Sequence, residues 1–143
     1  QALATALMEA TAERTQEVER LRALRSTCVT LLTEAFPESV VNGGGDKILP
    51  HIVNVSIPTI DPEYIVLALD AAGIAVATKS ACEEGRQDSH VVRALTGPEN
   101  AWRARTTLRL SFGHATREKD VVSAVAALRK AVAAYQKVAV DKL

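Results

Sequence analysis

The residue with the clearest chemical potential is Cys82, which closes a Ser-Ala-Cys tripeptide at residues 80–82. The tripeptide follows a short apolar run, residues 74–78, and residues 83–88 contain no apolar side chain that could anchor them. We therefore expect the thiol on a mobile, solvated loop at the end of a strand. A cysteine in that position could act as a thiolate nucleophile, held by the strand and still able to reach a partner.

Arg109 is the second candidate, and its chemistry would be the binding of a carboxylate. It lies in an alternating segment, residues 106–112, that predicts a strand. The apolar members of this segment would face inward: Leu108, Leu110 and Phe112. Arg109 would point to the opposite, polar face together with Thr107 and Ser111, and its guanidinium there offers a rigid, always charged pair of donors. An arginine on a polar strand face more commonly pairs with a nearby glutamate, so the residues alone leave both roles open.

Other polar and nucleophilic residues predict structure rather than chemistry. Cys28 lies among leucines at helical spacing, so we expect it to behave as a small buried hydrophobe. The three histidines, His51, His90 and His114, show no metal-binding spacing. The glycine run at residues 42–46 predicts a turn, because a phosphate-binding loop would need a lysine and hydroxyl pair and a helix after it.

Composition sets the class of protein. The 143 residues are 48% hydrophobic, which is enough for one ordinary core. Basic and acidic residues balance at 17 each and aromatic residues make up 3%, so we expect no nucleic-acid partner. No stretch reaches the roughly 18 apolar residues of a membrane span, so we expect no membrane partner either. The two distant cysteines favour a reducing compartment, and we expect a cytoplasmic protein.

Helical periodicity dominates both ends of the chain. Apolar or small residues recur at three-and-four spacing from residue 2 to residue 36, with an interruption around Arg14 and Glu17. This pattern predicts one long amphipathic helix that ends at Pro37. At the other end, we expect Thr116 to cap a final helix. Its inward stripe would be Val121, Val125, Leu128, Val132 and Tyr135.

Between the two helices, strand and helix patterns alternate. Residues 52–57 predict a half-buried strand whose polar face carries Asn54 and Ser56. Asp61 is expected to cap a helix that ends at Gly73, and Ser89 a shorter helix that runs through residue 95. A further strand is expected at residues 74–78. Together these elements predict an α+β fold, in which a long N-terminal helix precedes a small, mainly antiparallel sheet covered by helices.

Five ordered segments resemble the C-terminal part of cysteine desulfurases. They are residues 49–56 (LPHIVNVS), 67–76 (LALDAAGIAV), 80–82 (SAC), 89–95 (SHVVRAL) and 108–113 (LRLSFG). The similarity covers essentially the whole chain, and an ordered set is far more specific than any one segment. These enzymes are similar in fold to class V aminotransferases. In that family a large domain carries pyridoxal phosphate on a lysine, and a long helix joins it to a small C-terminal domain.

The resemblance implies a division of the chain. Residues 1–36 would be the helix that links the two domains, and residues 37–143 would form the small domain. The domain that binds pyridoxal phosphate would lie outside this chain, because none of its six lysines follows a histidine as the family's cofactor lysine does. The start at Gln1, without an initiator methionine, also suggests a piece of a longer protein. We therefore expect this fragment to be inactive alone.

The resemblance also implies roles for both candidate residues. In the family, the loop cysteine matched by Cys82 attacks the sulfur of an L-cysteine substrate held on the cofactor. Alanine is released, and the enzyme persulfide passes sulfur to an acceptor or scaffold protein for iron-sulfur clusters or thio-cofactors. Arg109 matches the residue that grips the substrate carboxylate. The full-length protein would be a homodimer.

The cysteine loop departs from the family pattern. Lys79 precedes the tripeptide, where a small residue is usual, and Glu83 and Glu84 follow it in place of serine or threonine. The loop to Ser89 is also slightly shorter, and no proline precedes that serine. These departures bear on substrate preference and on the acceptor. Two alternatives stay open: a non-catalytic interaction module of the same fold, and a class V relative that acts on another small amino acid.

Overall fold

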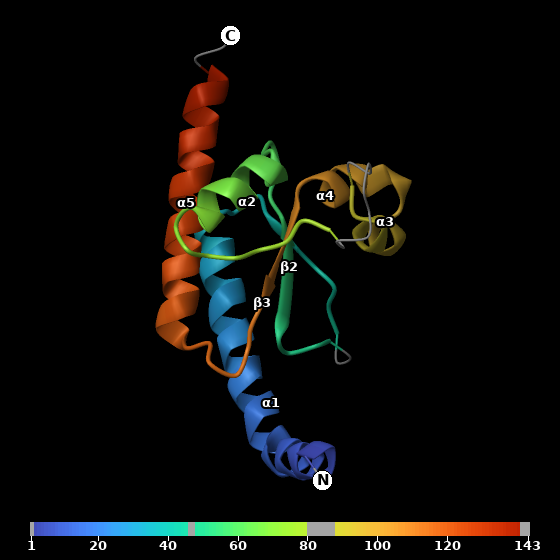
Figure 1. The fold of residues 1–143 in the computed structure, drawn as a ribbon. Helices are drawn as coiled ribbons and strands as arrows, with labels where there is room; N and C mark the ends of the chain where they lie inside the picture. The colour runs from blue at the N-terminus through green and yellow to red at the C-terminus, as the bar shows by residue number, and fades with distance from the viewer. Residues whose placement is uncertain (1, 46–47, 80–87, 141–143) are drawn as a thin grey trace.

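The computed structural model describes residues 2–45, 48–79 and 88–140, and Figure 1 shows how their elements are arranged. In chain order these are α1 (Ala2–Ala35), β1 (Val40–Asn42), β2 (Ile52–Ser56), α2 (Pro62–Asp70), α3 (His90–Thr96), a 3₁₀ turn (Pro98–Asn100), α4 (Ala101–Arg105), β3 (Thr107–Ser111) and α5 (Glu118–Val140). The expected α+β fold, with a long first helix followed by a small sheet and covering helices, is confirmed.

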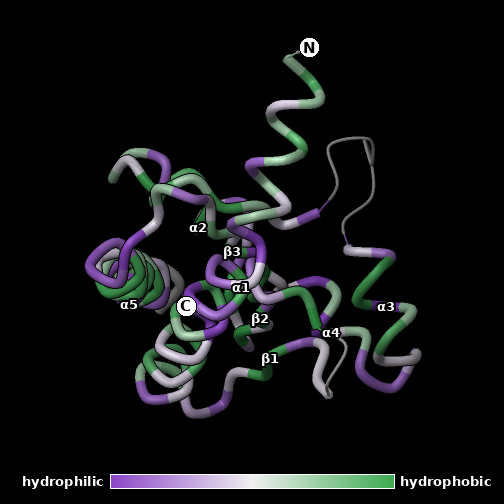
Figure 2. The backbone as a smooth tube through the Cα atoms, turned by 90° about the horizontal axis from the view of Figure 1, so that it is seen from below, coloured by the Kyte–Doolittle hydropathy of each residue, from purple (hydrophilic) through white to green (hydrophobic). Residues whose placement is uncertain are grey.

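The three strands form one antiparallel sheet in the order β1-β2-β3. In the central strand, Ser56 lies opposite Val40 of β1 and Ile52 lies opposite Ser111 of β3. Helices α1, α2 and α5 cover one face of this sheet, and α4 lies toward the other face, as Figures 1 and 2 show from two directions. The sheet therefore has one face that packs against α1, α2 and α5 and a second face that is directed toward α4.

The hydrophobic core lies between the apolar face of the sheet and helices α1, α2 and α5. Val53, Val55 and Leu108 are fully buried on the strands. The expected α5 stripe is confirmed, since its first four members are buried and Tyr135 packs against the core. The ring of Tyr135 lies 5.3 Å from that of Tyr64, which joins α5 to α2.

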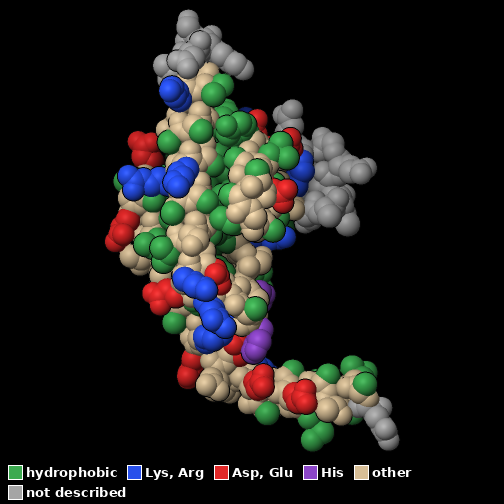
Figure 3. All heavy atoms as spheres, turned by 60° about the vertical axis from the view of Figure 1, so that its left-hand side comes forward, with side chains coloured by type: hydrophobic (Ala, Val, Ile, Leu, Met, Phe, Trp, Pro, Cys, Tyr) green, Lys and Arg blue, Asp and Glu red, His purple; other side chains and the backbone are tan. Residues whose placement is uncertain are grey.

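Helix α1 contributes only its second half to this core. Leu21, Leu24, Cys28 and Leu32 are its buried residues, whereas residues 2–16 are exposed. Figures 1 and 3 show the N-terminal turns extending from the body of the molecule at an angle to the rest of the helix. The helix thus anchors the sheet at one end and projects from it at the other.

The expected helix caps around the site are confirmed. A carboxylate oxygen of Asp61 accepts hydrogen bonds from the backbone N–H groups of Glu63 (2.9 Å) and Tyr64 (3.3 Å), and Pro62 opens α2. The Ser89 hydroxyl accepts from the N–H of Val92 at 3.4 Å at the start of α3. These caps fix the first turns of α2 and α3, which lie next to the described residues Lys79 and Asp88.

Two sequence-based expectations about the elements are wrong, and one strand was not predicted. Residues 74–78 form a single bridge, from Ala77 to Arg109, rather than a strand. Strand β1 was not predicted, because three residues are too few to show a period. The Thr116 hydroxyl does not cap α5 but accepts from the N–H of Gly113 at 2.9 Å, while Asp120 accepts from the backbone N–H of Arg117.

Candidate functional site

Arg109 lies near the middle of β3, on the face of the sheet away from the core. It is half-buried, and its backbone exchanges two hydrogen bonds with Ala77, at 2.6 and 3.1 Å. On its other side, Asn54 of β2 lies directly opposite. The bridge to Ala77 on one side and strand β2 on the other hold Arg109 within the sheet.

The guanidinium of Arg109 has no hydrogen-bond or ion-pair partner within the described residues. The common alternative for such an arginine, a pair with a nearby glutamate, is therefore not found in this part of the chain. Half-burial without a partner leaves a positive charge available to an anion, and the planar fork suits a carboxylate.

The sheet face around Arg109 is buried and polar, which the alternating pattern did not predict. Ser56 is 0% exposed and Thr107 is 1% exposed, although both were expected on a half-solvated face. They belong to one hydrogen-bonded cluster that includes residues of β1 and α4. The cluster consists of Asn42, Asn54, Ser56, Arg103 and Thr107.

The hydrogen bonds of this cluster link the buried polar groups of Asn42, Ser56 and Thr107 to their half-buried neighbours. The Arg103 guanidinium donates to Asn42 Oδ1 at 2.6 and 2.9 Å, and Asn42 Nδ2 donates to Asn54 Oδ1 at 2.6 Å and to Ser56 Oγ at 2.7 Å. The Ser56 hydroxyl donates to the backbone carbonyl of Arg103 at 2.8 Å. A connected network of this kind, whose hydrogen bonds join β1, β2, β3 and α4, rigidifies the face on which Arg109 lies.

Cys82 lies outside the described residues, together with the rest of segment 80–87. The structure does place the residues on either side of that segment. Thr78 and Lys79 before it, and Asp88 and Ser89 after it, line the same cavity of about 240 Å³ between the N-terminus of α2 and the end of α4. Thr107 lines this cavity as well, so the strand of Arg109 and the two ends of the cysteine segment border one region.

Two charged groups at this cavity, Lys79 and Asp88, form ion pairs. The Lys79 Nζ lies 3.6 Å from a carboxylate oxygen of Glu63, and the nearly buried carboxylate of Asp88 forms an ion pair with Arg93 of α3. Both pairs attach an end of segment 80–87 to a neighbouring helix. Lys79, which departs from the family pattern, thus has a structural contact of its own.

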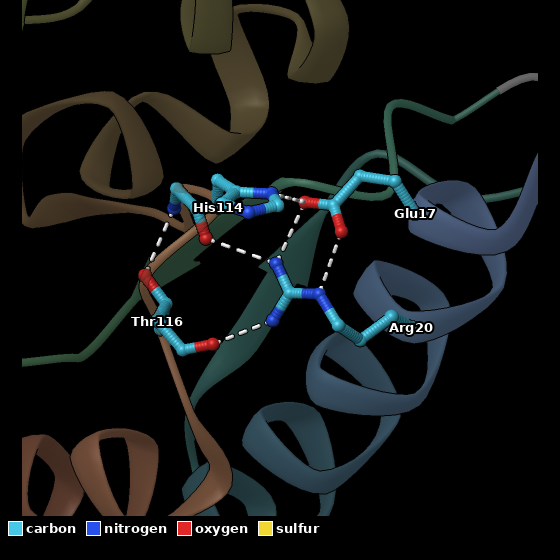
Figure 4. Close-up of polar contacts among 5 residues, drawn as sticks. Glu17, Arg20, His114 and Thr116 are labelled. Carbon is cyan, nitrogen blue, oxygen red and sulfur yellow. Dashed lines mark hydrogen bonds and ion pairs between the residues drawn. The ribbon is translucent and has the colours of Figure 1, made fainter. Parts of the chain in front are cut away.

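The end of β3 is held by a second arginine, Arg20, that sequence reasoning did not single out. Figure 4 shows Arg20 reaching from α1 to the turn between β3 and α5. Its guanidinium donates to the carbonyls of Gly113 (3.0 Å) and Thr116 (2.5 Å) and binds the Glu17 carboxylate through two bonds of 2.7 Å. The hydrogen bond with Arg20 lowers the pKa of Glu17 from its ordinary value. This contact ties the long helix to the strand that carries Arg109.

Cys28 is buried in the core, as expected. It is 0% exposed, and burial raises the pKa of its thiol to about 11. A thiol that stays protonated and inaccessible is inert toward electrophiles at neutral pH. Of the two cysteines, Cys28 is therefore the structural one.

The described residues offer neither a metal site nor a membrane span. Within residues 2–45, 48–79 and 88–140, no three metal-binding side chains gather at one place. His114 is exposed and lies 3.8 Å from Glu17. Over the same ranges, no helix combines the length and hydrophobicity that crossing a bilayer requires.

The described lysines do not fit a pyridoxal phosphate site. Lys119, Lys130 and Lys137 are exposed on α5. Lys79 borders the 240 Å³ cavity, but its Nζ lies 3.6 Å from a carboxylate oxygen of Glu63 and is engaged in that ion pair. None of these described lysines is therefore placed to form a Schiff base with the aldehyde of pyridoxal phosphate.

Sequence comparisons connect these features to known proteins. The family model Aminotransferase class-V matches residues 2–123. A protein named cysteine desulfurase from Klebsiella pneumoniae is 40% identical over 106 residues, which is 73% of this chain and 26% of that protein. A protein named cysteine desulfurase IscS 1 from Archaeoglobus fulgidus is 41% identical over 107 residues, 74% of this chain and 27% of that protein. The chain thus spans about a quarter of the length of these relatives.

Solved structures agree on the fold. A NifS-like protein superposes on 91% of this chain with a TM-score of 0.75 and 21% identity, and the match covers 32% of that structure. A NifS-like protein from Rickettsia africae gives a TM-score of 0.72 with the same identity and coverage. The arrangement of a long helix, a small sheet and covering helices is therefore one that occurs as about a third of a larger chain.

Proposed function

Because the chain belongs to the aminotransferase class V family, we propose that it is the C-terminal domain of a pyridoxal-phosphate-dependent cysteine desulfurase. Its similarity to proteins named cysteine desulfurases, over about three quarters of its length, carries this proposal. In the full-length protein, residues 1–36 link this domain to a large domain that binds the cofactor, and residues 37–143 form the small domain. The projecting, exposed first turns of α1 support the linking role.

Cys82 is the sulfur acceptor in this proposal. The sulfur of L-cysteine moves to the Cys82 thiol, which becomes a persulfide, and the substrate carbon that loses sulfur takes up hydrogen to give alanine. The net reaction balances without an external oxidant or reductant. Two observations support this role: the other cysteine is buried with a raised pKa, and both ends of the Cys82 segment border the cavity beside β3.

Arg109 binds the substrate carboxylate in this proposal. Its half-buried guanidinium has no partner within the described residues, and the bridge to Ala77 ties it to the chain that leads into the Cys82 segment. The substrate would thus be held by one strand while the thiol arrives from the adjacent segment. A sulfur-acceptor or scaffold protein then takes the persulfide sulfur for iron-sulfur cluster or thio-cofactor synthesis, and the full-length enzyme acts as a homodimer.

The proposal is tested in the full-length protein loaded with pyridoxal phosphate. L-cysteine should give alanine, Cys82→Ser should abolish persulfide formation while the cofactor stays bound, and Cys28→Ala should keep the activity as a matched cysteine control. Arg109→Ala should lower kcat/KM for L-cysteine by about 30-fold to several thousand-fold, because the carboxylate loses a charge-assisted contact. A wild-type protein that converts another small amino acid, and not cysteine, would overturn the proposal.

A further inference from the structure

The residue directly across from Arg109 is Asn54, and the register brings their side chains together. Hydrogen bonds from Ile57 N to the Thr106 carbonyl (3.3 Å) and from Phe112 N to the His51 carbonyl (2.8 Å) make these two residue pairs hydrogen-bonded pairs of the β2–β3 ladder. Hydrogen-bonded and non-hydrogen-bonded pairs alternate along an antiparallel ladder, so Asn54 and Arg109 form a non-hydrogen-bonded pair, in which the side chains are closer. The Cβ atoms of such a pair are about 4.5–5.5 Å apart on one face of the sheet.

The orientation of the Asn54 amide follows from Arg103. A guanidinium can only donate, so the Asn42 atom that lies 2.6 and 2.9 Å from Arg103 must be its oxygen. The Asn42 nitrogen therefore faces Asn54, and the Asn54 atom at 2.6 Å from it must be an oxygen. The Thr107 hydroxyl donates to the same oxygen at 2.7 Å. Both lone pairs of Asn54 Oδ1 are used, and its NH₂ group faces away from these two neighbours.

Two hydrogen-bond donors thus lie side by side, and the described residues provide no acceptor for either. Asn54 Nδ2, like the Arg109 guanidinium, has no acceptor within the described residues. Asn54 is half-buried, so its amide is held at the surface of the polar cluster rather than sealed inside it. A charged donor beside a neutral donor, both fixed by the sheet, is an arrangement that suits an anion with two oxygens.

We infer that Asn54 is a second substrate-binding residue, whose amide NH₂ donates to the carboxylate that Arg109 binds. This inference rests on the proposed function and adds a residue to the same site. Arg103 and Asn42 act as positioning residues, because they hold the Asn54 oxygen away from the substrate and turn its donor toward it. An amino acid with a free α-carboxylate is the substrate class that the pair selects.

The test uses the full-length, cofactor-loaded enzyme and compares three variants. The matched control is Thr107→Val, which removes one hydrogen bond to Asn54 Oδ1 and leaves Asn54 Nδ2 in place. The double variant Thr107→Val/Asn54→Val removes both the donor and the acceptor of the Thr107–Asn54 hydrogen bond. It therefore deletes Asn54 Nδ2, the proposed donor to the substrate, without leaving the Thr107 hydroxyl unpaired. Asn54→Asp replaces the donor by a carboxylate of the same shape. Kinetics with L-cysteine and inhibition by L-alanine, which keeps the carboxylate and lacks the thiol, are measured for each.

Relative to Thr107→Val, the double variant should raise KM for L-cysteine and Ki for L-alanine about 10-fold to 100-fold, with kcat little changed. Asn54→Asp should raise both by about 100-fold or more, because like charges then face each other. KM and Ki within about twofold of the control in either folded variant would overturn the inference. If the enzyme still desulfurates cysteine and still depends on Arg109, that result overturns only the role of Asn54, and the proposed function stands. A wild-type enzyme that does not desulfurate cysteine would overturn the proposed function itself.

Discussion

Replacing Arg103 by methionine tests whether the buried polar cluster holds the sheet face that carries Arg109. Arg103 supplies both donors to Asn42 Oδ1, at 2.6 and 2.9 Å, and Asn42 is only 7% exposed. The substitution Arg103→Met keeps much of the apolar stem and removes both donors. Asn42 Oδ1 is then buried without a donor, which costs about 1–3 kcal/mol of folding free energy, and the loss is larger because the bonds are charge-assisted.

We therefore expect Arg103→Met to destabilise the fold by about 2–3 kcal/mol. For a chain of this size, about 1 kcal/mol corresponds to roughly 2–4 °C in Tm, so thermal unfolding should move down by about 4–12 °C. The matched control is Arg105→Met, at an exposed position two residues away with no partner within the described residues, and its stability should change by less than about 0.5 kcal/mol. Equal melting of the two variants would show that the Arg103 contacts do not hold the sheet face.

Three further outcomes are expected. The 143-residue chain should fold and take up no pyridoxal phosphate; an absorbance band that survives dialysis and is trapped by borohydride on one of its lysines would contradict this. Because burial raises the pKa of Cys28 from 9.0 to about 11, the unfolded chain loses that proton first. Stability should therefore fall by about 2–3 kcal/mol as pH rises from about 9 to 11, and urea unfolding of Cys28→Ala should show a smaller fall. Arg109→Ala should change the free energy of unfolding by less than about 1 kcal/mol, and a domain that melts instead would make Arg109 a structural residue.

Local signals in the sequence were enough to predict most of the elements. Asp61, Pro62 and Ser89 act through hydrogen bonds and backbone angles within a few residues, so their effect can be predicted from the sequence alone. The apolar stripe of α5 was predicted for a similar reason, because a helix face needs only a 3.6-residue period. Burial of Cys28 followed from the same periodicity in α1.

The second face of the sheet could not be predicted in this way. A strand that alternates apolar and polar residues normally has one solvated face, and the alternation predicts Ser56 and Thr107 on it. Their burial depends on Arg103 and Asn42, which come from other parts of the chain and pair with them only in the folded state. The 74–78 segment was misread because an apolar run can pack against a core without a full ladder of hydrogen bonds. For Arg109, the strand and its outward face were predictable from the alternation, whereas Asn54 opposite it and the lack of a guanidinium partner among the described residues became known only from the structure.

The most direct test of the proposed role of Cys82 is the location of the persulfide. The full-length, cofactor-loaded protein is incubated with L-cysteine, its free thiols are blocked, and its peptides are mapped by mass spectrometry without a reductant. The expected result is one additional sulfur atom on the peptide that contains Cys82 and none on the peptide that contains Cys28. Sulfur on Cys28, or alanine released at the normal rate with no persulfide formed on Cys82 at any time, would contradict the role proposed for this domain.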